Sequence, residues 1–116
     1  MPIKTKRIYE KPEKSDGARV LIDRLWPRGL TKEKAKIDLW LRDIAPSSGL
    51  RKWFGHDPAK WPEFEERYIK ELKNNKEITD ILKKRAKKET LTLVYGAKDQ
   101  ERNDAVVLKN FLNKTP

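Results

Sequence analysis

The alternation of short β-type apolar runs with helical segments is the feature that most constrains the fold of this chain. The β-type runs occupy residues 3–9, 18–25, 37–41 and 91–95. Between them lie segments with helix-capping residues or with apolar positions that recur every three or four residues. We therefore expect an α/β fold, with a small and mostly parallel sheet of about four strands flanked by helices, because helices make the crossovers that parallel strands need.

The helical segments have recognisable starts and stops. We expect helices over residues 31–36, from Ser47 to a stop at Gly55, from the prolines at 58 and 62 to the asparagines at 74–75, over 76–88, and from Asp99 to the end of the chain. Within 76–88, Ile78, Ile81 and Leu82 are expected to point inward. Asp99 is expected to cap the final helix, unless it serves the site discussed below.

The length and the absence of cysteine limit the class of protein. A chain of 116 residues fits a single domain spanning residues 1–116. Without cysteine there is neither a disulfide nor a thiol nucleophile, so we expect a cytoplasmic protein. No apolar run approaches the roughly 20 residues that cross a bilayer, and no signal-peptide core follows Met1, so we expect no membrane partner.

The charge balance is strongly basic, with a net charge of +10 and a pI of about 9.8. Such a balance favours anionic partners, which include nucleic acids, nucleotides and small metabolites. Charged residues make up 40% of the chain and Gln100 is the only glutamine, a usage typical of a thermophile. Lysine enrichment of a heat-adapted surface would itself make the chain basic.

Polar clusters follow two of the expected strands. One comprises Asp23, Arg24, Trp26 and Arg28, and the other comprises Lys98, Asp99 and Arg102. If the two strands are parallel neighbours, both clusters open on the same edge of the sheet, where ligands of α/β proteins usually bind.

In such a site the two aspartates could act as acid and base, the basic residues could bind an anionic group, and Trp26 could stack on a base. The alternative is that Asp23 forms a structural ion pair with a nearby arginine, Asp99 only caps a helix, and Trp26 only packs.

His56 is the only histidine, and its side chain is the one whose ordinary pKa lies close to neutrality. It follows the expected helix stop at Gly55, beside Asp57, and is a candidate general acid or base. The alternative is that it only helps to cap the preceding helix. One histidine and no cysteine argue against a histidine-based metal site, and the sequence indicates no particular cofactor.

The densest basic run is KKRAKK at residues 83–88. It could contact a phosphate backbone, but no aromatic residue is interleaved with it. The simpler interpretation is the solvated end of a helix, where positive charge is favourable next to the negative end of the helix dipole.

Four blocks of sequence carry a resemblance to a known family. They are RVLIDRLWPRG (19–29), DLWL with IAPS (38–47), LRKWFGHDP (50–58) and YGAKD (95–99). Together they resemble the DUF488 family, in its short YeaO-like branch, and the resemblance implies an α/β fold of that type. Arg102 stands where YeaO-like relatives usually have histidine, and Gly96 and Ala97 stand where other branches carry cysteine, so neither imidazole nor thiol chemistry carries over to these positions.

Two functional hypotheses follow. In the first, a strand-end pocket binds an anionic, phosphate- or nucleotide-like ligand, with or without hydrolase or transferase chemistry. The catalytic groups would be Asp23, His56 and Asp99. The ligand contacts would be Arg24, Trp26, Arg28, Lys98 and Arg102. In the second, the chain is a non-catalytic, nonspecific nucleic-acid-binding protein. A concave site at the strand ends favours the first hypothesis, and an extended basic surface that includes residues 83–88 favours the second.

Overall fold

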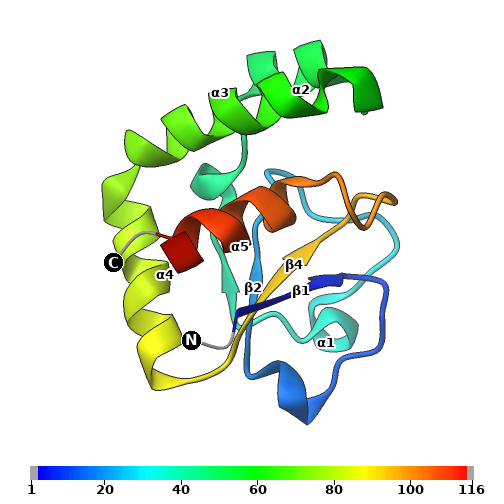
Figure 1. Cartoon of the computed structure of the whole chain (residues 1–116). Helices are drawn as coiled ribbons and strands as arrows, with labels where there is room; N and C mark the ends of the chain where they lie inside the picture. Colours follow the sequence, from blue (N-terminus) through cyan, green and yellow to red (C-terminus); the bar gives the residue numbers. More distant parts are fainter. Residues whose placement is uncertain (1–2, 115–116) are drawn as a thin grey trace.

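The computed structural model describes residues 3–114 (Figure 1). Its strands are β1 (Ile3–Arg7), β2 (Ala18–Leu21), β3 (Leu39–Trp40) and β4 (Leu91–Tyr95). Its α-helices are α1 (Lys32–Ala35), α2 (Ser48–Phe54), α3 (Trp61–Lys73), α4 (Lys76–Lys88) and α5 (Asp104–Lys114), and short 3₁₀ turns cover Lys14–Asp16, Arg42–Ile44 and Pro58–Lys60.

The strands form one four-stranded sheet in the order β1-β4-β2-β3, and every pair is parallel. The expected α/β class is therefore confirmed. β2 and β4 are central neighbours, with Val20 opposite Leu93, and both strands are buried along their whole length. This double burial is typical of a parallel sheet covered on both faces.

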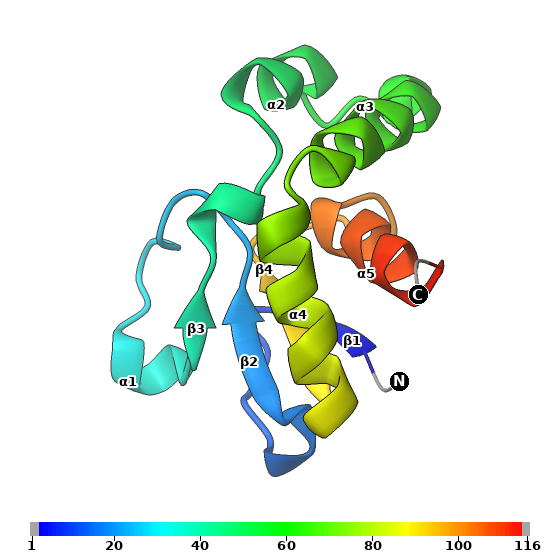
Figure 2. The same cartoon turned by 90° about the vertical axis from the view of Figure 1, so that its left-hand side faces the viewer.

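Helices cover the two faces of the sheet unequally (Figure 2). The main core lies between the sheet and helices α3, α4 and α5, and Tyr68, Leu82 and Leu108 are among its fully buried side chains. A smaller cluster on the other face packs Leu21 and Val94 against Ala35 of α1 and the loop that follows β2. The strands point their carboxyl ends toward α2 and α3, which lie across that edge of the sheet.

Several expected helix boundaries are confirmed by the capping contacts. The Ser47 side chain accepts a hydrogen bond from Leu50 N at 3.2 Å, and Gly55 ends α2 in the left-handed conformation. Thr31 caps α1 in the same way through Lys34 N. α4 and β4 have the expected bounds of 76–88 and 91–95.

Three strands are shorter than expected, and the first of them, β1, ends at Arg7 rather than at residue 9. β2 ends at Leu21 rather than at residue 25, because the chain leaves the sheet at Asp23, whose carbonyl accepts a hydrogen bond from Trp40 Nε1 at 2.7 Å. β3 retains only Leu39 and Trp40 of the expected alternating run, since a 3₁₀ turn begins at Arg42.

Two expectations about the helices are wrong. Asp99 does not cap the final helix, because it accepts hydrogen bonds from the N–H groups of Glu101 and Arg102 in a turn, and Asn103 caps α5 through Val106 N at 3.0 Å. Ile81 is not inward but 45% exposed. The buried face of α4 runs through Thr79, Leu82 and Ala86, which are spaced three and four residues apart, and Ile81 lies beside that stripe.

A buried ion-pair network ties β2 to the segment that precedes it. Asp16 and Arg19 are each 3% exposed, and their side chains pair at 2.7 Å. Arg19 also donates to Ala35 O, and Lys6 of β1 pairs with Asp16 at 3.1 Å. Although burial opposes it, hydrogen bonds from Glu13 N, Lys6 and Arg19 lower the pKa of Asp16 below its ordinary value.

We predict that Asp16→Ala destabilises the fold by about 3–5 kcal/mol, because it leaves the buried Arg19 guanidinium without a counter-charge. Urea denaturation of the variant would measure the loss. Glu66→Ala, at an exposed position of α3, is the matched control and should change the free energy of unfolding by no more than ~0.5 kcal/mol. An equally small effect of Asp16→Ala would show that the network contributes nothing to stability.

Candidate functional site

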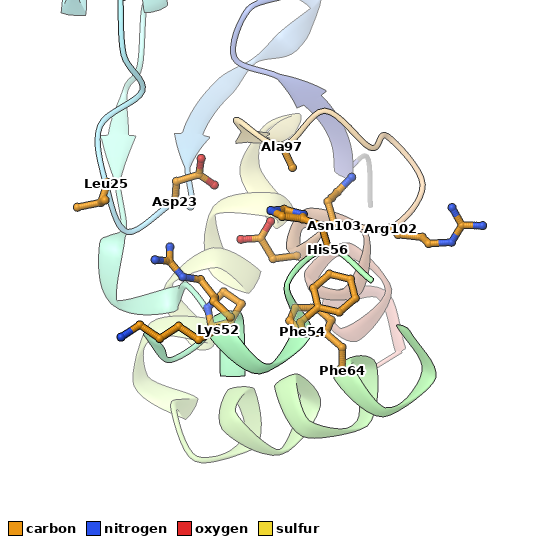
Figure 3. Close-up of a pocket in the computed structure, with 12 residues that line it drawn as sticks. Asp23, Leu25, Lys52, Phe54, His56, Phe64, Ala97, Arg102 and Asn103 are labelled. Atoms are coloured by element: carbon orange, nitrogen blue, oxygen red, sulfur yellow. The ribbon is translucent and has the colours of Figure 1, made fainter. Parts of the chain in front are cut away.

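A cavity of about 430 Å³ opens at the carboxyl ends of β2 and β4, on the side that faces α2 and α3 (Figure 3). We call it the strand-end cavity. Figure 3 shows Asp23 and Ala97 on its sheet side, and Phe54 and Phe64 on the helices opposite. The full lining comprises Asp23, Leu25, Pro46, Arg51, Lys52, Phe54, His56, Phe64, Ala97, Arg102, Asn103 and Asp104.

A second cavity, of about 480 Å³, adjoins the first, and we call it the outer cavity. Its lining comprises Phe54, His56, Gly96, Ala97, Lys98, Asp99 and Arg102. Four of these residues, Phe54, His56, Ala97 and Arg102, also line the strand-end cavity. Each cavity has the volume of an ordinary small-ligand site.

Asp23 is held in place by the neighbouring strand. Its Oδ2 accepts a hydrogen bond from Gly96 N at 2.9 Å, which joins the chain after β2 to the chain after β4. A Cβ atom at position 96 would lie 2.9 Å from the same oxygen, so a larger residue there would displace the Asp23 carboxylate from its present position. Burial raises the pKa of Asp23 above its ordinary value, although the Gly96 hydrogen bond and the Arg51 charge act in the opposite direction.

Asp104 is the second carboxylate of the strand-end cavity and begins α5. Its Oδ1 accepts a hydrogen bond from Ala105 N at 3.1 Å. Burial and the nearby Asp23 carboxylate raise the pKa of Asp104 to about 7, against the effect of the backbone N–H groups and of Arg51. The pair therefore retains a proton close to neutral pH, because two carboxylates in one buried site do not both ionise readily.

Positive charge surrounds this pair. Arg51 and Lys52 lie on the exposed side of α2, and the Arg51 charge acts on both carboxylates. Arg102 lines both cavities and pairs with Asp99 at 3.3 Å. Three cationic side chains thus accompany two carboxylates in the strand-end cavity.

The aromatic side of the cavity is rigidly packed. The rings of Phe54 and Phe64 stack at 4.4 Å, and His56 lies 6.0 Å from Phe54 between ring centroids. His56 follows Gly55, and both have positive φ angles, of 57° and 53°. This tight turn at the end of α2 brings an exposed imidazole to the shared wall of the two cavities.

The structure brings five of the eight residues proposed from the sequence to these cavities. Asp23 lines the strand-end cavity, Lys98 and Asp99 line the outer cavity, and His56 and Arg102 line both. The Asp99 carboxylate is engaged by two backbone N–H groups and by Arg102, and these hydrogen bonds lower its pKa. It is held as an anion in the turn after β4.

The other three lie outside both linings. Arg24 turns toward Pro46 O, at 3.5 Å, and lines a separate pocket of about 190 Å³. The Trp26 indole donates to Leu30 O at 2.7 Å and packs on Trp40 in the smaller core cluster. Arg28 is exposed, and its carbonyl accepts from the Tyr9 hydroxyl at 3.3 Å. These three are therefore left out of the candidate site.

The sequence reasoning missed four polar residues that line the strand-end cavity, namely Arg51, Lys52, Asn103 and Asp104. Asp104 could have been found from the start of α5, since an acid in the first turn often marks a helix start. Placing that start at Asp99 hid this signal. Arg51 and Lys52 carry no local signal of a site, because only the tertiary position of α2 over the strand ends brings them to the cavity.

Within residues 3–114, no three histidine, cysteine or acidic side chains are grouped as metal ligands would be. The same residues contain no helix that is both long enough and apolar enough to cross a bilayer.

The raised pKa of Asp104 predicts a pH-dependent stability. Unfolded aspartate loses its proton near pH 4, whereas folded Asp104 keeps it until about pH 7, so the free energy of unfolding should fall as the pH rises through this range. Asp104→Asn should remove that slope, and the variant should gain stability relative to wild type between about pH 5 and 8. Urea denaturation at a series of pH values measures the difference.

Asp99→Asn is the matched control for this experiment. The pKa of the Asp99 carboxyl is lowered in the folded protein, so its contribution to the free energy of unfolding is lost only as the pH falls below the ordinary aspartate range. The difference between Asp99→Asn and wild type should stay constant between about pH 5 and 8. A constant difference for Asp104→Asn as well would contradict the assignment of a retained proton to the Asp23–Asp104 pair.

Comparison with known proteins places the chain in a family. A family model described as the inactive DUF488-N3 subclade matches residues 2–115. The uncharacterized protein YeaO of Escherichia coli is 43% identical over 112 residues, which cover 97% of each chain. Uncharacterized proteins of Mycobacterium tuberculosis and Mycobacterium bovis are 36% identical over 111 residues, covering 96% of this chain and 93% of theirs. No solved structure gave a significant match. The chain therefore belongs to the DUF488 family, within the subclade described as inactive DUF488-N3.

Proposed function

We propose that the protein binds a small anionic, phosphate- or nucleotide-like ligand at the carboxyl edge of its sheet. The observation that carries this proposal is the excess of cationic side chains around the two cavities. Arg51 and Lys52 line the strand-end cavity, Lys98 lines the outer cavity, and Arg102 lines both. These four cations face three carboxylates, Asp23, Asp99 and Asp104, so the balance of charge in the two linings is positive. A positive cleft attracts anionic ligands, and the net charge of +10 adds a long-range attraction.

Binding without catalysis is the form of this function that we favour over a hydrolase or transferase. The matching family model carries the description inactive, which supports a binding role. The side-chain contacts support the same conclusion. The Asp99 carboxylate already accepts hydrogen bonds in the turn after β4, and the His56 imidazole makes no hydrogen bond with any group of residues 3–114. An acid–base pair built from His56 and Asp99 would lack the orienting contact that such pairs use.

We predict that Lys98→Gln and Arg102→Gln each weaken the binding of adenosine monophosphate by about tenfold or more, since each removes one charge-assisted contact. Isothermal titration calorimetry measures the affinity. Arg28→Gln is the control, because Arg28 lies outside both cavities and should leave the affinity unchanged. If Arg28→Gln is the variant that abolishes binding, the ligand lies beyond the two cavities.

Nonspecific nucleic-acid binding is the second candidate function, and one observation favours it as a separate surface. α4 leads from the carboxyl edge of the sheet down to the start of β4, so its basic end lies at the edge opposite the cavities (Figure 2). Lys84, Lys87 and Lys88 are exposed there. Such a surface can contact phosphates, and phosphate contacts carry no direct information about the sequence.

We predict that any duplex DNA binding is weak and steeply salt-dependent. Binding through roughly 6–10 phosphates should lose about 10³–10⁵ in affinity between ~50 and ~200 mM salt. Replacing Lys83, Lys84, Lys87 and Lys88 with Gln should reduce it, while adenosine monophosphate binding persists. Tight duplex binding at high salt that survives the four-lysine variant and is lost in Arg102→Gln would instead make the cavities a nucleic-acid site.

A further inference from the structure

Within residues 3–114, the two carboxylates of the strand-end cavity receive hydrogen bonds from backbone N–H groups and from no side chain. Gly96 N donates to Asp23 Oδ2, and no group of residues 3–114 donates to Asp23 Oδ1. In the same part of the chain, the Asp104 carboxylate has only the backbone N–H groups of Ala105 and of Asp104 itself as donors. Oxygens of partly buried carboxylates need donors, so this end of the cavity is complementary to a group that carries several.

The charge of these carboxylates already has a compensating partner. Arg51 acts on both Asp23 and Asp104, and the pair retains a proton near neutral pH. A further cation is therefore not required for electrostatic balance. Uncharged hydrogen-bond donors of a ligand would instead satisfy the carboxylate oxygens of Asp23 and Asp104 that lack a donor. Vicinal hydroxyl groups of a sugar supply two such donors at adjacent positions, and carboxylates bind sugar hydroxyls in this way in dinucleotide-binding folds.

The outer cavity, in contrast, offers hydrogen-bond donors and positive charge. Lys98 makes no ion pair or side-chain hydrogen bond with the rest of residues 3–114, and the same holds for His56 apart from its ring contact with Phe54. Asp99, the acid in this lining, is neutralised locally by Arg102 and by two backbone N–H groups. Unpartnered donors and a lysine suit a phosphate group.

The two cavities adjoin along a common set of residues. Phe54, His56, Ala97 and Arg102 line both. Ala97, which has a small side chain, comes directly after the Gly96 that holds Asp23. A ligand that reaches past Ala97 would place one end at the two carboxylates and the other end beside Lys98.

We propose that the ligand is a phosphorylated sugar, free or as part of a nucleotide, whose hydroxyl groups bind Asp23 and Asp104 and whose phosphate lies in the outer cavity beside Lys98 and His56. This inference rests on the proposed function, since it names the class of anion that the site would select. The phosphate alone would occupy only one of the two halves.

Three small probes test the proposal in calorimetric titrations of the whole chain. Methyl phosphate carries the phosphate alone, ribose 5-phosphate adds neutral hydroxyls, and phosphoethanolamine adds a cationic head. We expect ribose 5-phosphate to bind at least about tenfold more tightly than methyl phosphate, as each charge-assisted hydrogen bond gained is worth that much. Phosphoethanolamine should gain no comparable advantage.

Two variants locate the halves of the site. Asp104→Asn should reduce the preference for ribose 5-phosphate over methyl phosphate and leave methyl phosphate affinity unchanged. Lys98→Gln should weaken both ligands by a similar factor. Circular dichroism melts of both variants test whether the fold is retained. Glu66→Gln, at an exposed position of α3 outside both cavities, serves as the control carboxylate variant, for which the preference should persist.

The outcomes separate this inference from the function on which it rests. If none of the three probes binds the wild type, the anion-binding function itself fails. If methyl phosphate binds as tightly as ribose 5-phosphate, or if Asp104→Asn keeps the preference, the site takes anions but does not recognise a sugar. A preference for phosphoethanolamine over ribose 5-phosphate would assign an ammonium group to the carboxylates and overturn the sugar proposal.

Discussion

The hydrogen bond from Gly96 N to Asp23 Oδ2, at 2.9 Å, is the contact on which the carboxyl edge of the sheet depends. It forms where the chain leaves the two central parallel strands, so it continues the pairing of β2 with β4 beyond the last ladder contact. A Cβ at position 96 would displace the Asp23 carboxylate. The contact places one Asp23 oxygen against the backbone, while no group of residues 3–114 donates to the other. The sheet thus positions the Asp23 carboxylate and leaves one of its oxygens available to accept a hydrogen bond from a ligand.

The electrostatics of the edge follow from that placement. A partly buried carboxylate raises the proton affinity of its neighbour, and the first turn of α5 brings Asp104 to the same cavity. Arg51 and Lys52 come from α2, which lies across the strand ends, and Lys98 and Arg102 come from the chain after β4. Two carboxylates therefore share this edge of the sheet with four cationic side chains. A binding site with this polarity selects ligands that have both donors and an anionic group.

Much of the fold could be predicted from the sequence because its signals are local. The cap at Ser47, the stop at Gly55 and the apolar run of β4 each depend on a few neighbouring residues. The site could be predicted only in part. Asp23 and His56 stand out by residue type and position, but the route of a loop decides whether Arg28 reaches a cavity, and no local pattern records that route. Asp104 could be found only from the true start of α5, and it was concealed because the N-cap was expected at Asp99, four residues before the observed cap at Asn103.

An NMR titration of ¹⁵N-labelled protein with ribose 5-phosphate tests most directly whether the carboxyl edge of the sheet is a binding site. Amide shifts report local contacts residue by residue, so they locate the ligand as well as detect it. We expect saturable changes at the amides of Gly96 and Ala105, which donate to the two carboxylates, and at His56 and Lys98 of the outer cavity. Changes confined to the basic end of α4, or no saturable change at Gly96 and Ala105, would contradict the account.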